Sequence, residues 1–132
     1  MLDNTITLPV DQLANDVLVD ESFTRFDEFQ NRAVYVGPGH SLSKRNTLTT
    51  YRTLPKKSGN FNGVGKSAAK FTQDFEVPGV DLSTTVIGSG IVDISTSFAV
   101  GMTDAECMGM RQRAIAFLDH AIATRAQEGL EY

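Results

Sequence analysis

One long segment of this chain carries charge of a single sign, and that sign suits phosphate binding. Between Phe29 and Gln73 there are no acidic residues and eight basic ones: Arg32, Lys44, Arg45, Arg52, Lys56, Lys57, Lys66 and Lys70. The net charge of the chain is −4, so the acidic residues gather outside this segment. Because the field at a protein surface follows the local charge, this separation predicts a positive zone that attracts a polyanion such as nucleic acid. The simpler alternative is a solvated basic surface without a partner.

Three other patterns could carry chemistry, and each lacks a required part. Residues 63–67, GVGKS, end like a phosphate-binding P-loop, but Asn60 stands where that motif needs its first glycine. His40 and His120 have no Ser or Cys nucleophile in a recognisable turn. Cys107 has no partner at metal-ligand spacing, and its place among apolar residues predicts a small core side chain. We therefore predict no enzyme activity, no cofactor and no metal.

Length and composition predict one globular domain over residues 1–132, with 41% hydrophobic and 21% charged residues. No apolar run approaches the length of a membrane span, and the first residues do not resemble a signal peptide. The single cysteine excludes an intrachain disulfide, so we expect a chain suited to a reducing compartment.

The elements that must position the basic residues are mainly strands. Segments rich in β-branched and aromatic residues occur at 5–8, 17–19, 33–36, 47–54, 66–77 and 84–100. Turn sequences separate them, among them GPG at 37–39 and NG at 62–63. Short connections between successive strands favour an antiparallel meander over parallel strands joined by helices.

The two longest predicted strands alternate between polar and apolar residues. In 66–77 the apolar set is Ala69, Phe71, Phe75 and Val77, and the polar set includes Lys66, Lys70, Thr72, Asp74 and Glu76. In the last strand the apolar set is Val92, Ile94, Phe98 and Val100, with Asp93, Ser95 and Ser97 opposite. Since side chains alternate across a strand, the pattern predicts one covered face and one open polar face.

A helical region follows at about 103–127. Thr103 and Glu106 fit a capping box, and apolar residues recur at helical spacing after it. The sequence leaves open whether the region breaks or bends near Asp119 and His120, so one or two helices are expected. The apolar stripe is wide for a single helix, so it suits packing on the sheet of the chain itself, a dimer interface, or both. The fold class is therefore α+β.

Two stretches resemble the coat proteins of levivirus-type single-stranded RNA bacteriophages. The stretch YRTLPKKSGNFNGVGKSAAKFTQDFEV, residues 51–77, is similar to the central hairpin of that family: a strand, a basic polar turn, and a strand of the type Lys-aromatic-Thr-x-x-apolar-Glu-Val. The stretch IVDISTSFAVGMTDAE, residues 91–106, is similar to the family's last strand and capped helix. Agreement in element order extends from about residue 31 to the end of the helix.

The resemblance implies a structural function. Its members have an N-terminal hairpin and about five more strands, and they form interlocked dimers with the helices of each subunit across its partner. Dimers build an icosahedral shell whose open sheet face meets the single-stranded genomic RNA, and this face can bind a stem-loop that represses translation. We therefore expect a capsid protein of a virion, assembled in the cytoplasm of a bacterial host, with itself and RNA as partners and no membrane. The 78–84 loop is expected to join dimers.

The alternation and the resemblance together imply a set of RNA-binding residues: Lys66, Lys70, Thr72, Arg52, Thr50, Asp93 and Ser95. Two positions depart from the family pattern. Ile91 occupies the position of an aromatic residue that stacks a base, and Asp74 stands where a second lysine is expected. Attraction to the RNA backbone survives such changes, because counterion release is independent of base identity. The alternative is a small non-viral RNA-binding module that forms no particles.

Overall fold

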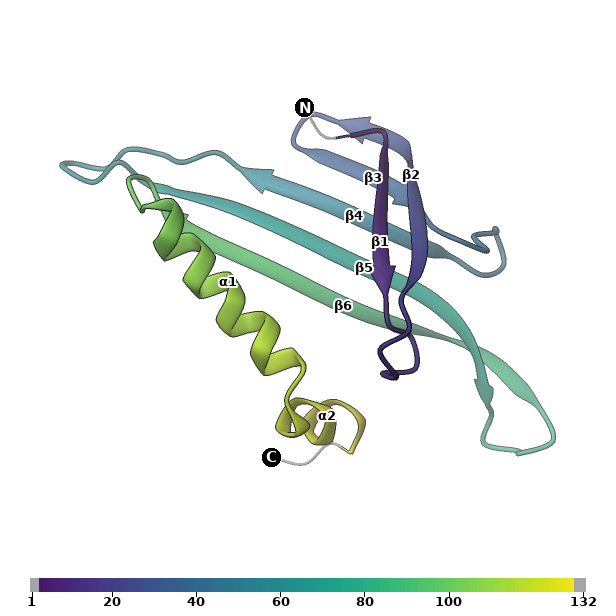
Figure 1. Ribbon diagram of the computed structural model, residues 1–132. Helices are drawn as coiled ribbons and strands as arrows, with labels where there is room; N and C mark the ends of the chain where they lie inside the picture. Colours follow the sequence, from purple (N-terminus) through teal and green to yellow (C-terminus); the bar gives the residue numbers. More distant parts are fainter. Residues whose placement is uncertain (1–2, 130–132) are drawn as a thin grey trace. The chain divides into compact units, whose positions relative to one another are not determined.

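The computed structural model describes residues 3–129 and contains one sheet followed by two helices (Figure 1). The strands are β1 (Thr5–Val10), β2 (Val19–Phe29), β3 (Arg32–Val36), β4 (Asn46–Thr53), β5 (Val64–Pro78) and β6 (Thr85–Ala99), and the helices are α1 (Asp104–Leu118) and α2 (Ala121–Glu128). Each strand is adjacent in the sheet to the next one in sequence. The predicted α+β meander is confirmed; within residues 3–129 the N-terminal hairpin is followed by four strands, where about five were expected.

The contacts within the chain define two compact units. The first contains most of the sheet, with residues up to 54 and residues 65–97. The second contains the connection between β4 and β5, at 55–64, and the helical region from residue 98. The candidate site lies within the first unit.

The N-terminal hairpin of the first unit folds over the strands that follow it. A β-bulge between Arg25 and Asp27 interrupts the pairing of β2 with β3, and bulges bend the strand that carries them. In Figure 1, β1 and the first half of β2 cross the other strands steeply. Phe23 of β2 therefore packs edge-on against Phe71 of β5, which is not its neighbour in the sheet, with 6.0 Å between ring centroids. The Tyr35 hydroxyl donates to the carbonyl oxygen of Asp3 at 2.9 Å.

The core lies under this hairpin, on the face of the sheet that we call the apolar face. Its buried residues are Phe23, Ala33, Tyr35 and Leu48, and the partly buried residues packed on them are Ile6, Leu8, Ala69 and Phe71. Close packing also fixes Gly37 at the end of β3: a Cβ atom there would stand 2.5 Å from the Phe23 ring. A side chain at position 37 would therefore displace the hairpin from the sheet.

The helices of the second unit follow the predicted signals. The Thr103 hydroxyl accepts a hydrogen bond from the backbone N–H of Glu106, and the Glu106 carboxylate accepts one from the backbone N–H of Thr103. This capping box starts α1, with Asp104 and Glu106 near the positive end of the helix dipole. Of the two alternatives left open by the sequence, the structure has two helices: α1 ends at Leu118, and the His120 ring caps α2 by accepting from the Ile122 backbone N–H. Neither described helix has the length and apolar character needed to cross a membrane.

Candidate nucleic-acid interface

The register of β4 against β5 defines the face of the sheet opposite the core, which we call the polar face. Thr47 pairs with Thr72, Thr49 with Lys70, and Thr53 with Lys66. Residues directly opposite one another in an antiparallel pair point to the same side of the sheet. Lys66, Lys70 and Thr72 therefore share the polar face, as the alternation of β5 predicts.

A hydrogen bond extends this face onto β6. The Ser89 hydroxyl donates to the Asp74 carboxylate at 2.6 Å, so Ser89 points to the same side as Asp74. Because side chains alternate along a strand, Asp93 and Ser95 lie on this side as well. Five of the residues proposed from the sequence are thus brought to one surface: Lys66, Lys70, Thr72, Asp93 and Ser95.

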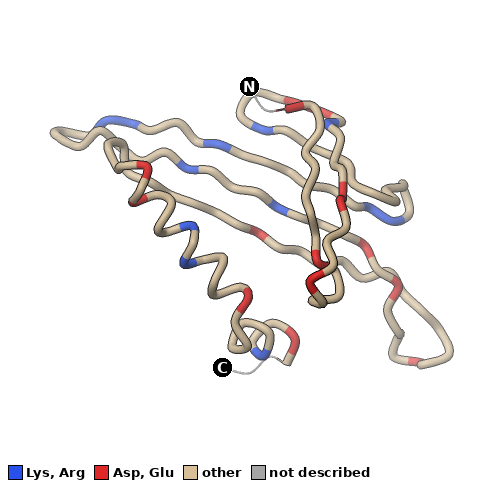
Figure 2. Tube along the Cα trace, viewed as in Figure 1, with Lys and Arg blue, Asp and Glu red and all other residues tan. Residues whose placement is uncertain are grey.

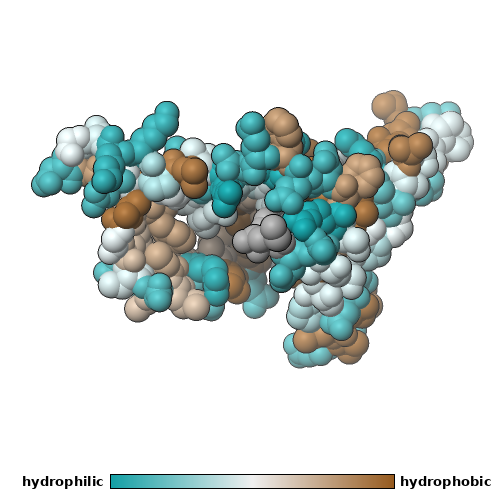
Figure 3. Space-filling model, turned by 90° about the horizontal axis from the view of Figure 1, so that it is seen from above, coloured by the Kyte–Doolittle hydropathy of each residue, from teal (hydrophilic) through white to brown (hydrophobic). Residues whose placement is uncertain are grey.

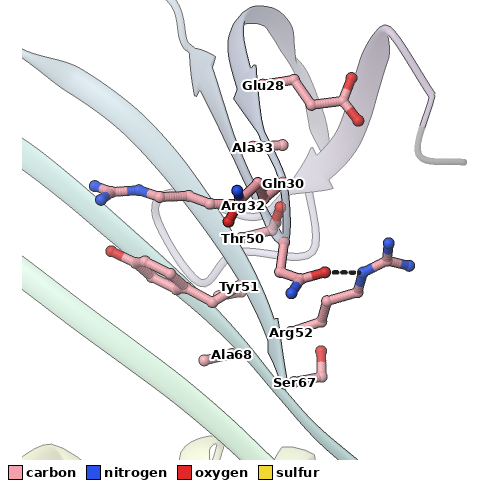
Figure 4. Close-up of a pocket in the computed structure, with 11 residues that line it drawn as sticks. Glu28, Gln30, Arg32, Ala33, Thr50, Tyr51, Arg52, Ser67 and Ala68 are labelled. Carbon is pink, nitrogen blue, oxygen red and sulfur yellow. Dashed lines mark hydrogen bonds between the residues drawn. The ribbon is translucent and has the colours of Figure 1, made fainter. Parts of the chain in front are cut away.

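The expectation that Thr50 and Arg52 share this surface is wrong. Thr50 pairs with Ala69 and Arg52 with Ser67, which places both on the apolar face. Figure 4 shows the Arg52 and Tyr51 side chains on opposite sides of β4. The resemblance selected the wrong alternate residues of β4, and a difference of one residue places a side chain on the other face of the sheet. The β4 residues of the polar face are Thr47, Thr49, Tyr51 and Thr53.

Arg52 and Thr50 line a cavity of about 350 Å³ on the apolar face (Figure 4). The Arg52 side chain donates to the Asn31 amide oxygen at 3.0 Å, which holds it at the rim. The Thr50 hydroxyl is buried, and no hydrogen-bond partner for it occurs among residues 3–129. A buried hydroxyl without a partner is costly, so the Thr50 hydroxyl is available to a polar group that enters this cavity.

The carboxylate of Asp74 is neutralised on the polar face. Arg45 donates to it through its backbone N–H at 2.9 Å and through its side chain at 3.1 and 3.3 Å. Hydrogen bonds from the Arg45 side chain, then from Ser89 and from the Arg45 backbone, hold the pKa of Asp74 well below its ordinary value. The Asp74 side chain is 6% exposed and the Arg45 side chain is 56% exposed, so the surface of this ion pair is formed mainly by the cation. The departure at position 74 therefore does not present a free negative charge to RNA.

The free positive charge of the polar face includes two lysines of β5. Lys44 is bound to Glu76 at 2.9 Å, and Arg45 is bound to Asp74. None of the ion pairs found within residues 3–129 involves Lys66 or Lys70. Figure 2 shows basic residues along β5 and on the neighbouring segments. Since their charges are not compensated by a carboxylate, these lysines are the groups most available to a phosphate.

An aromatic residue on the polar face was missed by the sequence analysis. Tyr51 pairs with Arg32 of β3, and the Arg32 guanidinium carbon lies 5.1 Å from the centre of the Tyr51 ring. This is within the range of a cation–π contact. The pair brings a stacking surface and a cation together, and only the correct register of β4 reveals it.

No protein-family model and no curated protein sequence matches this chain. Solved structures do match it. A chain of the virus-like particle of Beihai levi-like virus 21 has a TM-score of 0.72 at 15% identity, over 97% of this chain and 94% of that chain. A chain of the virus-like particle of bacteriophage AVE019 has a TM-score of 0.72 at 13% identity, over 97% of this chain and 95% of that chain. A chain of the virus-like particle of Wenzhou levi-like virus 4 has a TM-score of 0.66 at 21% identity, over 92% of this chain and 82% of that chain.

These likenesses extend over nearly the whole chain and establish its architecture. The chain has the fold found in the virus-like particles of levi-like viruses and bacteriophages. The resemblance noted in the central hairpin and in the last strand predicted this fold.

Proposed function

We propose that this chain is a structural capsid protein that dimerises, assembles into an icosahedral shell and packages single-stranded RNA against the polar face of its sheet. It has no catalytic role in this proposal. Its place is the virion, and assembly takes place in the cytoplasm of a bacterial host. The fold shared with virus-like particles supports the proposal. The observation on which it mainly rests is the surface of the single chain.

That surface contains apolar residues that a lone subunit leaves in water. On the apolar face of β5 and β6, Phe75 is 47% exposed, Val92 54% and Ile94 42%. No residue of α1 is buried, although Met108, Ile115 and Phe117 are large and apolar. Figure 3 shows hydrophobic side chains at the surface among hydrophilic ones. Exposed apolar side chains on a sheet face and on a helix are typical of an interface, and we propose that further copies of the chain cover them.

The sheet also has an edge that a second strand could complete. β6 is the last strand in the sheet order and is 15 residues long. The outer edge of such a strand carries backbone N–H and C=O groups without strand partners, which another strand can pair. Edge-to-edge pairing of two β6 strands would join two sheets into one and extend both the polar and the apolar face.

The connection between β5 and β6 is our proposed contact between dimers. It is an ordered turn, in which the Gly79 N–H donates to the Thr84 carbonyl at 3.0 Å and Ser83 donates twice to the Asp81 carboxylate. These bonds from Ser83 lower the pKa of Asp81. Val80 and Leu82 are almost fully exposed on this turn. A rigid turn that displays two apolar side chains suits docking on another subunit.

The decisive experiment is electron microscopy of the expressed, purified protein, combined with extraction of nucleic acid after nuclease treatment. The proposal predicts closed particles that contain protected RNA. A stable monomer or lone dimer under all assembly conditions would overturn it. Salt-sensitive RNA binding without any particle would instead favour the small RNA-binding module.

We further propose that the polar face binds a stem-loop and so represses translation of a viral gene. The free Lys66 and Lys70 support this, together with the hydroxyl of Thr72 on the same face. Selection of tightly bound RNAs from a random pool tests it. A common stem-loop among the selected sequences is expected, whereas selection of unrelated sequences would restrict the polar face to non-specific packaging.

A further inference from the structure

A groove on the polar face combines the groups that a single nucleotide requires. It measures about 370 Å³, within the range of small-ligand sites, and is formed by β4, β5 and β6. Each of these strands contributes three consecutive residues to the groove. The first and third residue of each set point to the polar face, and these are Tyr51, Thr53, Lys66, Ala68, Ser95 and Ser97. None of the residues lining the groove is acidic.

The register creates space beside the Tyr51 ring. Arg32 lies over the ring from β3, at 5.1 Å from its centre. On the β5 side, the residue directly opposite Tyr51 is Ala68, whose side chain is a single methyl group. Figure 4 shows the ring between Arg32 and Ala68. One side of the ring is therefore held by a cation, and the other borders the groove.

The remaining groups of the groove are polar and available. Lys66 is exposed and forms no ion pair with any residue in the described range. The hydroxyls of Thr53, Ser95 and Ser97 take part in none of the hydrogen bonds found within residues 3–129, and these residues are exposed. An ammonium group suits a phosphate, hydroxyls suit the edges of a base or a ribose, and an aromatic ring suits the face of a base.

We propose that this groove holds one unpaired nucleotide of the bound RNA, with its base stacked on Tyr51 and its phosphate at Lys66. The proposal rests on the RNA binding proposed above and adds a subsite to it. Arg32 acts as a positioning residue, because its contact with the far side of the ring fixes the ring for stacking. Stacking on an aromatic ring tolerates any base, so the subsite favours unpaired over base-paired nucleotides rather than one base over another.

The test compares full-length protein variants in binding to a short oligouridine and to an abasic oligonucleotide of the same length. Tyr51→Leu is expected to weaken oligouridine binding between about 5-fold and about 150-fold, the range for loss of one stacked base. Tyr51→Phe retains the ring and is expected to bind as the wild type does. Neither change is expected to alter binding of the abasic strand, which has nothing to stack.

A second variant keeps the ring and fills the groove. Ala68→Leu places a larger side chain where the base would lie, so it is expected to weaken oligouridine binding and to leave abasic binding unchanged. If Tyr51→Leu and Ala68→Leu both bind oligouridine as the wild type does, the subsite is wrong. If Lys70→Ala still reduces the salt dependence in that case, the proposed RNA binding stands without the subsite. If the wild type binds neither strand in a salt-dependent way, both proposals fall.

Discussion

On the proposed function, Lys66 and Lys70 carry most of the attraction of the polar face for RNA, because other cations beside them are already engaged. Lys44 and Arg45 each hold a carboxylate, and Arg32 lies over the Tyr51 ring. A cation that must first leave a carboxylate gains less from a phosphate than a free cation does. The eight basic residues of the central segment are thus unequal, and the two lysines on β5 should dominate.

Lys70 and Arg52 form a matched pair of basic residues on opposite faces of the sheet. Lys70→Ala is expected to reduce the slope of log K against log salt for single-stranded RNA by about 0.7, the value for one phosphate contact. Arg52→Ala should leave the slope unchanged, because register places Arg52 on the apolar face. Titrations at several salt concentrations measure both slopes. An equal loss from both variants would refute the division between the faces.

Asp74 should make the stability of the protein sensitive to acid. Its pKa is lowered in the folded state by Arg45 and Ser89, so the unfolded chain binds the proton first as the pH falls. The stabilisation is fully present above the ordinary carboxyl pKa of about 3.9 and is lost progressively below it. Asp74→Asn is expected to lower the Tm at pH 7, and the difference from the wild type should shrink as the pH falls below about 4. Thermal unfolding of both proteins over this pH range measures the difference in Tm. If the difference in Tm is the same at all pH values, the ionised Asp74 is not its cause.

At the scale of elements, short sequence patterns predicted features that depend only on neighbouring residues. The long strands alternate visibly, and the capping box and the break between α1 and α2 are contained in short stretches of sequence. The extent of β2 was missed: residues 20–28 contain many charged residues and only Phe23 is buried among them, so the alternation is weak. The bulge that folds the N-terminal hairpin over the sheet has no clear signature in the sequence.

The relation between elements was harder to predict than the elements themselves. The alternation within β5 identified Lys66, Lys70 and Thr72, but no pattern within β4 states which of its faces aligns with β5. Thr50 and Arg52 were therefore assigned to the wrong side, and Tyr51 was overlooked. Arg45 and Asp74 are 29 residues apart, and only the folded sheet brings them together. Site residues that depend on register require the structure.

The capping box of α1 gives a prediction at this scale. Thr103→Ala removes the hydroxyl that accepts from the Glu106 N–H and is expected to cost about 1 kcal/mol of helix stability. Thr103→Ser keeps an acceptor at the same place and serves as the control, with little change expected. Circular dichroism at 222 nm during thermal unfolding measures both. If the alanine and serine variants lose stability equally, the hydrogen bond is not what starts the helix.

At the scale of the whole molecule, the core is small for the length of the chain. The buried apolar residues within 3–129 are Phe23, Ala33, Tyr35, Leu48 and Ala123, in a protein of 132 residues. Many larger apolar side chains of β5, β6 and α1 are exposed instead. Burial of apolar surface is the main favourable contribution to folding. If the chain assembles as we propose, a large part of its stability therefore comes from the association of subunits.

Neighbouring residues on β6 separate association from RNA binding. Ile94 lies on the apolar face and Ser95 on the polar face, so Ile94→Asp places a charge in the proposed interface between copies. We expect Ile94→Asp to abolish particles and leave small species, and Ser95→Asp to keep the association of subunits while weakening RNA binding by charge repulsion. Sedimentation without RNA and a parallel binding titration distinguish the two. Normal association of the Ile94→Asp protein would exclude this face from the interface.

The scarcity of buried residues in the lone chain has a consequence for the life of the protein in a cell. A subunit completed only by other copies gains stability by mass action, so its resistance to unfolding rises with its concentration. Newly made chains that remain sparse would open often and be cleared by host proteases. Chains made in abundance would protect one another. On the proposed function, the exposed apolar face would thus make survival of the protein depend on its rate of synthesis.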